Sequence, residues 1–168
     1  GSVSGTIFTK INGKERLIVS PTLFYNYPLL PALNFIKNGN TWSFENSYTS
    51  GAMGAGRNYE CLDSASQTWV YADHGLELSS GTWPHGNILL MKSMGNALSF
   101  SNISIARSFY HSVSTGDLNN DGLMDVVGLN MGTKGDWYDN LHTYLQNSDG
   151  SFSENRSILM SNAGGRGA

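Results

Sequence analysis

Apolar and polar residues alternate in short runs along this chain, and one hairpin-like pattern occurs three times. It covers residues 33–44, 88–100 and 142–152. Each copy has an apolar or alternating stretch, a turn containing Gly with Asn or Ser, and a Ser-Phe pair that begins the next stretch. Alternation with a period of two, interrupted by such turns, is typical of β-hairpins. The pattern therefore predicts three two-stranded hairpins.

A second repeated feature has nearly the same period. Apolar stretches at residues 17–20, 69–72 and 126–129 precede the three hairpins, and Phe44, Phe100 and Phe152 of the Ser-Phe pairs are 56 and 52 residues apart. No segment sustains helical spacing of apolar residues. A repeat of about 50–60 residues with roughly four strands matches one blade of a β-propeller.

We therefore predict an all-β chain, a single β-propeller-type region over residues 1–168. It contains about three four-stranded antiparallel blades, with approximate repeats 1–53, 54–108 and 109–168. Propellers typically use about four to eight blades, and an open stack leaves apolar faces and strand edges exposed. Further blades of a longer chain, or self-association, are expected to cover them.

The most distinctive stretch is residues 117–125, Asp-Leu-Asn-Asn-Asp-Gly-Leu-Met-Asp. Oxygen-bearing side chains occupy every second position, followed by Gly122 and a last carboxylate, which suits the six to eight oxygen ligands that Ca²⁺ takes from a flexible loop. An EF-hand needs Glu at its twelfth position, which is Gly128 here. The β-branched residues that follow predict a strand, so we expect a calcium loop within β-structure.

The corresponding loops of the other two repeats lack this acidic set. Residues 10–16 contain Lys10, Lys14 and Arg16, which would repel a cation. Residues 63–68 keep only Asp63. Only the third loop is expected to bind a metal.

Residues 116–127 and 147–152 resemble the FG-GAP/VCBS repeat family, the integrin-α-like calcium-binding propeller blades, and residues 71–75 and 109–112 resemble variants of it. This resemblance implies a secreted, extracellular or cell-surface protein. Carried onto this chain, it implies calcium ligands in one loop: the side chains of Asp117, Asn119, Asp121 and Asp125 and the carbonyl of Leu123. Such blades occur in adhesion receptors, in lectins and beside polysaccharide-degrading enzymes, so the fold leaves the function open.

Aromatic residues gather in the segments between the second strand and the hairpin of each repeat. They are Tyr25 and Tyr27 (with Phe24), Trp83 with His85, and Trp137 with Tyr138. Aromatic rings beside Asp and Asn suit sugar stacking, which motivates a lectin-like ligand site. Packing between blades or against a partner protein explains the same rings equally well.

Composition limits the partners. The net charge of −3 argues against nucleic acid or an anionic membrane as the main partner, and no apolar run approaches the ~20 residues of a membrane span. Cys61, the single cysteine, is expected to be buried as a small apolar residue. Asn102 and Asn155 begin formal N-glycosylation triplets.

We expect no catalytic residues. Asp73 and His74 are neighbours on a predicted strand and would point to opposite faces, and no Ser-His-Asp or Cys-His arrangement can be placed. The predicted function is a calcium-stabilised extracellular adhesion or interaction module that binds protein or glycan. The alternatives are a structural subunit of an extracellular filament or assembly formed by blade-edge pairing, and a propeller segment of a polysaccharide-degrading enzyme such as a lyase.

Overall fold

The computed structural model describes residues 2–22, 32–48, 56–73, 86–95, 97–104, 108, 110–130 and 139–160. Twelve strands, arranged in three four-stranded antiparallel sheets, and no helix occur in this part of the chain. The predicted all-β class and sheet composition are thus confirmed. No helix of the described residues is long and apolar enough to cross a membrane.

The first sheet follows chain order. Its strands are β1 (Ser2–Ile11), β2 (Lys14–Thr22), β3 (Ala32–Asn38) and β4 (Thr41–Tyr48). The two residues between β1 and β2, Asn12 and Gly13, both have positive φ, at 51° and 74°. Two-residue hairpin turns of this handedness match the twist of the flanking strands and favour Asn-Gly.

The second and third sheets repeat this order. The second contains β5 (Gly56–Asp63), β6 (Thr68–Asp73), β7 (Ile88–Met94) and β8 (Ala97–Asn102). The third contains β9 (Tyr110–Gly116), β10 (Asp125–Asn130), β11 (Asp139–Gln146) and β12 (Phe152–Met160). The hairpins expected at 33–44, 88–100 and 142–152 are β3–β4, β7–β8 and β11–β12, and the three apolar stretches lie in β2, β6 and β10.

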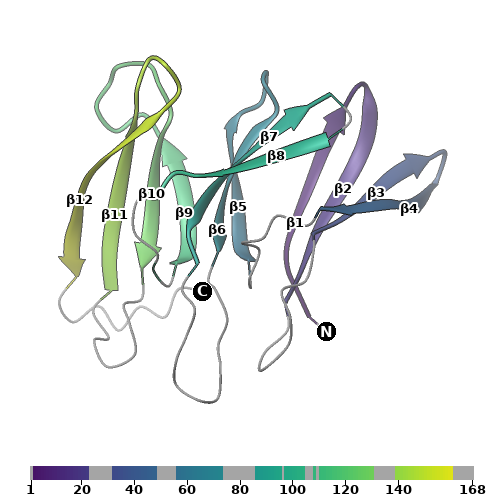
Figure 1. Ribbon diagram of the computed structural model, residues 1–168, viewed down its shortest axis with the longest axis horizontal. Coiled ribbons are helices and arrows are strands. Elements are labelled where there is room, and N and C mark those ends of the chain that lie inside the picture. The colour runs from purple at the N-terminus through teal and green to yellow at the C-terminus, as the bar shows by residue number, and fades with distance from the viewer. Residues whose placement is uncertain are drawn as a thin grey trace.

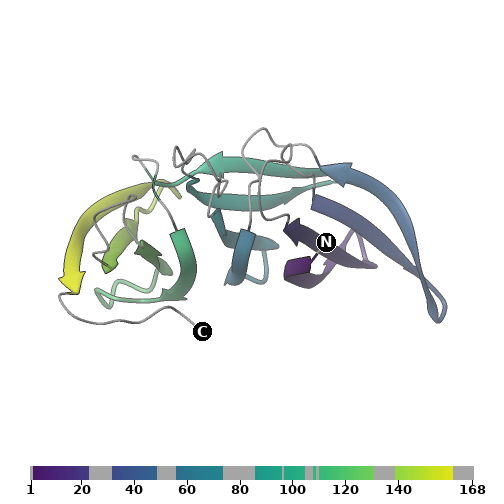
Figure 2. The same cartoon turned by 90° about the horizontal axis from the view of Figure 1, so that it is seen from below.

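The first strands of the three sheets lie side by side. β1 contacts β5, and β5 contacts β9. From these strands the sheets spread on one side as a fan, with the second sheet between the other two (Figures 1 and 2). The turns of β1–β2, β5–β6 and β11–β12 all lie at the upper ends of their sheets in Figure 1.

An apolar core lies between each pair of neighbouring sheets. The first core, between the first and second sheets, includes Ile7, Ile18, Trp69, Tyr71 and Met91. The second core, between the second and third sheets, includes Val70, Ile88, Tyr110, Val126 and Tyr144. Every residue of β6 is buried, because successive side chains of a strand point to opposite faces and both faces of this sheet are covered.

Close approach between the second and third sheets requires a glycine. A Cβ at Gly128 of β10 would lie 2.3 Å from Cδ1 of Ile88 on β7. The first strands are joined across the same interface by Asn58 of β5, whose side chain donates to the carbonyl of Val113 and accepts from its N–H, both at 2.8 Å. The side chain thus substitutes for strand pairing where the sheets meet.

Candidate functional site

The loop between β9 and β10 is the predicted calcium loop, and it folds on itself through its own side chains. Asp117 accepts hydrogen bonds from two main-chain N–H groups, those of Asp121 at 3.1 Å and Gly122 at 3.0 Å. Asn120 and Gly122 have positive φ, 60° and 85°. Gly adopts this conformation without steric cost and Asn tolerates it, so the chain can curl around the first carboxylate.

The middle residues of the loop are cross-linked in the same way. The Oδ1 atom of Asn119 accepts from the N–H of Asp121 at 3.1 Å, and the Asn119 amide donates to Asp121 Oδ2 at 2.8 Å. Asp121 Oδ1 accepts from the N–H of Leu123 at 2.8 Å. These contacts hold Asp117, Asn119 and Asp121 together on one short, exposed loop.

Asp125 ends the loop and is fully buried at the first position of β10. Its Oδ2 accepts from the N–H of Leu118 at 2.8 Å, and its Oδ1 accepts from the N–H of Gln146, at the end of β11, at 2.9 Å. The carboxylate therefore connects the beginning of the loop to the neighbouring hairpin. A strand follows it, as predicted, and not the exiting helix of an EF-hand.

The donor set of this loop is chemically suited to a hard cation. All its side-chain donors are oxygens, and a carboxylate oxygen that accepts one N–H keeps a second lone pair. Among the described residues, no three His, Cys, Asp or Glu side chains group as a metal site. The loop instead combines carboxylates with the Asn119 amide and the main chain, and Asp125 is held between the N–H of Leu118 in the loop and that of Gln146 at the end of β11.

The turn between β11 and β12, which contains the second family-like segment, lies at the same end of the third sheet. Its N–H groups bond within the turn, from Asn147 to the Ser151 carbonyl and from Gly150 to the Asn147 carbonyl, both at 2.8 Å. Asp149 accepts from the N–H and hydroxyl of Ser151, and these bonds lower the pKa of its carboxyl. Asp149 therefore provides an acidic residue near the candidate loop but outside it.

The equivalent connections of the other sheets are short turns. Asn12 and Gly13 alone join β1 to β2. Between β5 and β6, Asp63 accepts from the N–H groups of Ala65 and Ser66 at 2.9 and 3.3 Å, which satisfies its carboxylate within the turn. Neither turn supplies the alternating oxygens of the third loop.

Most other predicted site residues cannot be placed. Tyr25, Tyr27, Trp83, His85, Trp137 and Tyr138 lie outside the described residues, as do Phe24 and His74. Asn102 is exposed at the end of β8, opposite Leu89. Asn155 lies within β12, and its side chain is not described.

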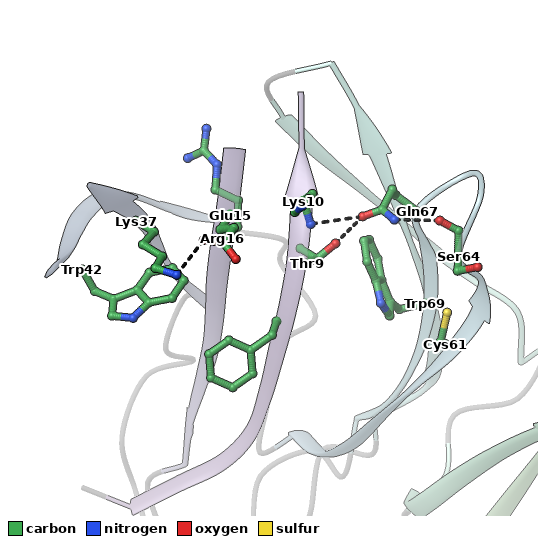
Figure 3. Close-up of a pocket in the computed structure, with 11 residues that line it drawn as sticks. Thr9, Lys10, Glu15, Arg16, Lys37, Trp42, Cys61, Ser64, Gln67 and Trp69 are labelled. Carbon is green, nitrogen blue, oxygen red and sulfur yellow. Dashed lines mark hydrogen bonds and ion pairs between the residues drawn. The ribbon is translucent and has the colours of Figure 1, made fainter. Parts of the chain in front are cut away.

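An open hollow of about 580 Å³ lies near the turn end of the first and second sheets (Figure 3). Its lining residues are Phe8, Thr9, Lys10, Glu15, Arg16, Lys37, Trp42, Cys61, Ser64, Gln67 and Trp69. Consecutive strand residues point to opposite faces, so Phe8, Thr9 and Lys10 bring both faces of the first sheet into the lining. The hollow extends around the edge of β1, where Thr9 and the N–H of Lys10 donate to Gln67.

Cys61 is exposed and lines this hollow, which corrects the expectation that it is buried. Cys61 is on β5, opposite Trp69 of β6, at the edge of the first core. Partial burial, together with the nearby Asp63 and Glu60 carboxylates, raises the pKa of its thiol. Because the thiolate is the reactive form, these surroundings do not activate it as a nucleophile.

A polar cluster inside the third sheet has no counterpart among the residues singled out from the sequence. The hydroxyls of Tyr110 and Tyr144 are 2.8 Å apart, and each is 3.3 Å from His142 Nδ1. Asn130 Nδ2 is 3.4 Å from His142 Nε2, and Glu154 is 3.5 Å from Nδ1. Burial lowers the pKa of His142, opposed by Glu154, and raises the pKa of both tyrosines.

Comparison of the sequence with protein families and with curated proteins found no relative. No protein-family model matches the chain, and no curated protein matches its sequence. The resemblance to FG-GAP/VCBS blades therefore stays a prediction from the residues that suggested it.

Proposed function

We propose that the chain is a calcium-stabilised, non-catalytic interaction module of an extracellular or cell-surface protein, and that it binds protein or glycan. The observation that carries this proposal is the folded loop from Asp117 to Asp125, in which alternating oxygen side chains are held together by main-chain N–H groups. A structural cation there would offset the repulsion between neighbouring carboxylates. Its binding free energy would then become folding free energy.

The position of the loop supports a structural role for the ion. Asp117 directly follows β9, and Asp125 begins β10 and is bonded to the end of β11. An ion bound to these oxygens would tie three strands of the third sheet at one end. A catalytic ion would additionally need an open coordination position beside a base, and the bonds of this loop do not supply that pair.

Exposed aromatic side chains of the first sheet support the interaction role. Phe8 and Phe44 of the first sheet are 71% and 59% exposed, and Trp42 is 38% exposed. Large aromatic side chains at a surface are enriched in protein interfaces. The aromatic residues of the segments outside the described structure, Trp83 and Trp137 among them, provide the composition expected for sugar stacking.

Calcium binding is tested by thermal unfolding with calcium and with a chelator. At free calcium of about a hundred times Kd, ligand linkage gives roughly 2.7 kcal/mol, which corresponds to a rise in Tm of roughly 5–10 °C for a chain of this size. Asp121→Ala should abolish this rise. Asp149→Ala, an acidic turn residue at the same end of the sheet, should preserve it. Equal Tm values with calcium and chelator for the unmodified chain would refute the calcium site.

The glycan form of the interaction role is tested on a glycan array in calcium. Binding that is lost in Trp83→Ala or Trp137→Ala would support it, with Asp149→Ala as a matched surface control. No glycan binding at any calcium concentration would leave protein as the ligand class.

A further inference from the structure

The first sheet carries an apolar face that nothing in the described structure covers. We call the side chains that point away from the second sheet the first-sheet outer face: Phe8, Leu17, Phe35, Trp42 and Phe44. Phe8 and Trp42 form an edge-to-face pair with ring centroids 6.1 Å apart, and Phe35 and Phe44 form another at 5.8 Å. Single exposed apolar residues are ordinary, but a continuous aromatic patch marks an interaction surface.

The repeat shows what covers this face elsewhere in the molecule. Phe44, Phe100 and Phe152 occupy the same place in the three repeats. Phe100 packs against the first core and Phe152 against the second, each between its own sheet and the preceding one. Phe44 is 59% exposed because no sheet precedes the first one in the described structure.

The second strands give the same result independently. Leu17, Trp69 and Val126 begin the three equivalent apolar stretches. Trp69 is buried in the first core and Val126 in the second. Leu17 is adjacent to Ile18, which is buried in the first core, so Leu17 points to the opposite side of the sheet.

The third sheet has a complementary free face. The third-sheet outer face contains Val127, Leu129, Leu141 and Leu145, which lie on the side opposite Val126 and Tyr144 of the second core. Val127 is the equivalent of Ile18 and Val70, each of which is fully buried against the following sheet. Val127 is only half-buried.

Electrostatics does not oppose docking of these two faces. On the side of the first sheet that bears the outer face, Glu15 and Lys37 pair at 2.7 Å and so neutralise each other, and Lys10, opposite Glu15, adds one positive charge. The pair lowers the pKa of the Glu15 carboxyl, which keeps it ionised and paired. On the third-sheet outer face Thr143 and Ser112 are uncharged, and Asp125, which alternation places on the same side, is buried with both oxygens bonded to main-chain N–H groups.

We propose that the occupant of the first-sheet outer face is the third-sheet outer face of a second copy of this chain. Two copies related by a twofold axis would form this contact twice and close a ring of six sheets, within the usual range of about four to eight propeller blades. Each new interface continues the two internal ones, which already stack equivalent faces in the same order. This deepens the interaction role proposed above by naming a partner, and it does not depend on calcium.

The first test is the mass of the unmodified chain in solution, measured by light scattering across a wide concentration range, with calcium and with chelator. The expected mass is twice the 18.2 kDa of one chain. A mass of one chain at every concentration, in both buffers, would overturn the proposal. The calcium-dependent Tm could still be present in that case, so the two proposals fail separately.

The second test uses one charge on each face. Phe44→Asp and Val127→Asp should each reduce the mass to that of one chain. An equimolar mixture of the two should recover a two-chain species, because each variant retains the face that the other lacks. Met94→Asp is the matched control: this residue is 63% exposed on the second sheet, whose two faces are already covered, and the variant should remain a dimer.

Other outcomes of the second test contradict this arrangement. If Val127→Asp remains a dimer while Phe44→Asp does not, two first-sheet outer faces dock on each other. If the two single variants stay monomeric when mixed although both are folded by circular dichroism, the contact is not head-to-tail. Should either variant fail to fold, Trp42→Asp and Leu129→Asp replace them on the same two faces.

Discussion

The first and third sheets differ most clearly at one equivalent buried position. The residue before Leu17 is Arg16, the residue before Val126 is Asp125, and the second sheet has Thr68 at this place. All three are buried, at 4%, 0% and 3% exposure. This position is polar in every repeat, but its charge is positive in the first sheet and negative in the third. The connection before the strand, and not the core, therefore determines which polar residue occupies it.

In both sheets the charge of this buried residue suits the connection that precedes it. Asp125 accepts main-chain N–H groups from the acidic loop and from β11. Arg16 follows a two-residue turn flanked by lysine and pairs with Glu45 of β4. The same sheet architecture therefore forms with an acidic, cation-suited connection or with a basic one, and the proposed cation site depends on the loop and not on the fold.

Replacing Asp125 should have the largest effect. Asp125→Ala leaves the N–H groups of Leu118 and Gln146 without their acceptor, and an unsatisfied buried group costs about 1–3 kcal/mol. For two such groups we expect a loss of roughly 2–6 kcal/mol in the free energy of unfolding, measured by urea titration in chelator so that calcium does not contribute. Asp149→Ala removes an exposed carboxylate and should reduce the free energy of unfolding much less. Similar losses for the two variants would contradict the structural role of Asp125.

Replacing Arg16 should have a small effect. The Nε of Arg16 has no hydrogen-bond partner within the described part of the chain, and a buried ion pair often returns little net stability. Glu45 is 36% exposed and also accepts from Asn34 at 2.9 Å, so it keeps a partner and water. We expect Arg16→Met to change the free energy of unfolding by about 1 kcal/mol or less. A loss as large as that of Asp125→Ala would remove the contrast between the two sheets.

The features that could be predicted from the sequence are those set by local spacing. Alternation with a period of two, the polar turns that contain Gly and the repeated Ser-Phe pairs predicted hairpins at 33–44, 88–100 and 142–152, and the structure contains all three. A loop from Asp117 that leads into a strand was also predicted, and it is found between β9 and β10; its calcium stays a prediction. Such features depend only on residues a few positions apart, so they can be recognised from one sequence without knowing how the sheets pack.

The features that could not be predicted depend on which sheet face another sheet covers. Cys61 is exposed because it lies where the first core ends, and Phe44 is exposed although Phe100 and Phe152 are not. The sequence aligns Arg16, Thr68 and Asp125 as the residues before the three apolar stretches, but it does not predict that all three are buried. The His142 cluster likewise joins β9, β10, β11 and β12, which are separated along the chain.

The third sheet also differs from the first by a titratable group at a core-facing position. His142 lies opposite Gly128, as Leu33 lies opposite Val19 in the first sheet. Since burial lowers the pKa of His142 below its usual value near 6.5, the unfolded chain binds the proton more readily. The contribution to stability is therefore fully present above about pH 6.5 and is lost as pH falls from there towards the folded-state pKa, with a slope of at most about 1.4 kcal/mol per pH unit.

Urea titrations between about pH 7.5 and 5.5 measure this pH-dependent contribution. His142→Gln should flatten the profile in this window, whereas His111→Gln, on the neighbouring strand β9, should retain the slope due to His142. The carboxyls of Asp63 and Asp149 have lowered pKa values, so their contribution is lost at more acidic pH and does not overlap with this window. An unchanged profile in His142→Gln would mean that burial of this ring does not couple its protonation to folding, and the third sheet would then differ from the first only at its loop.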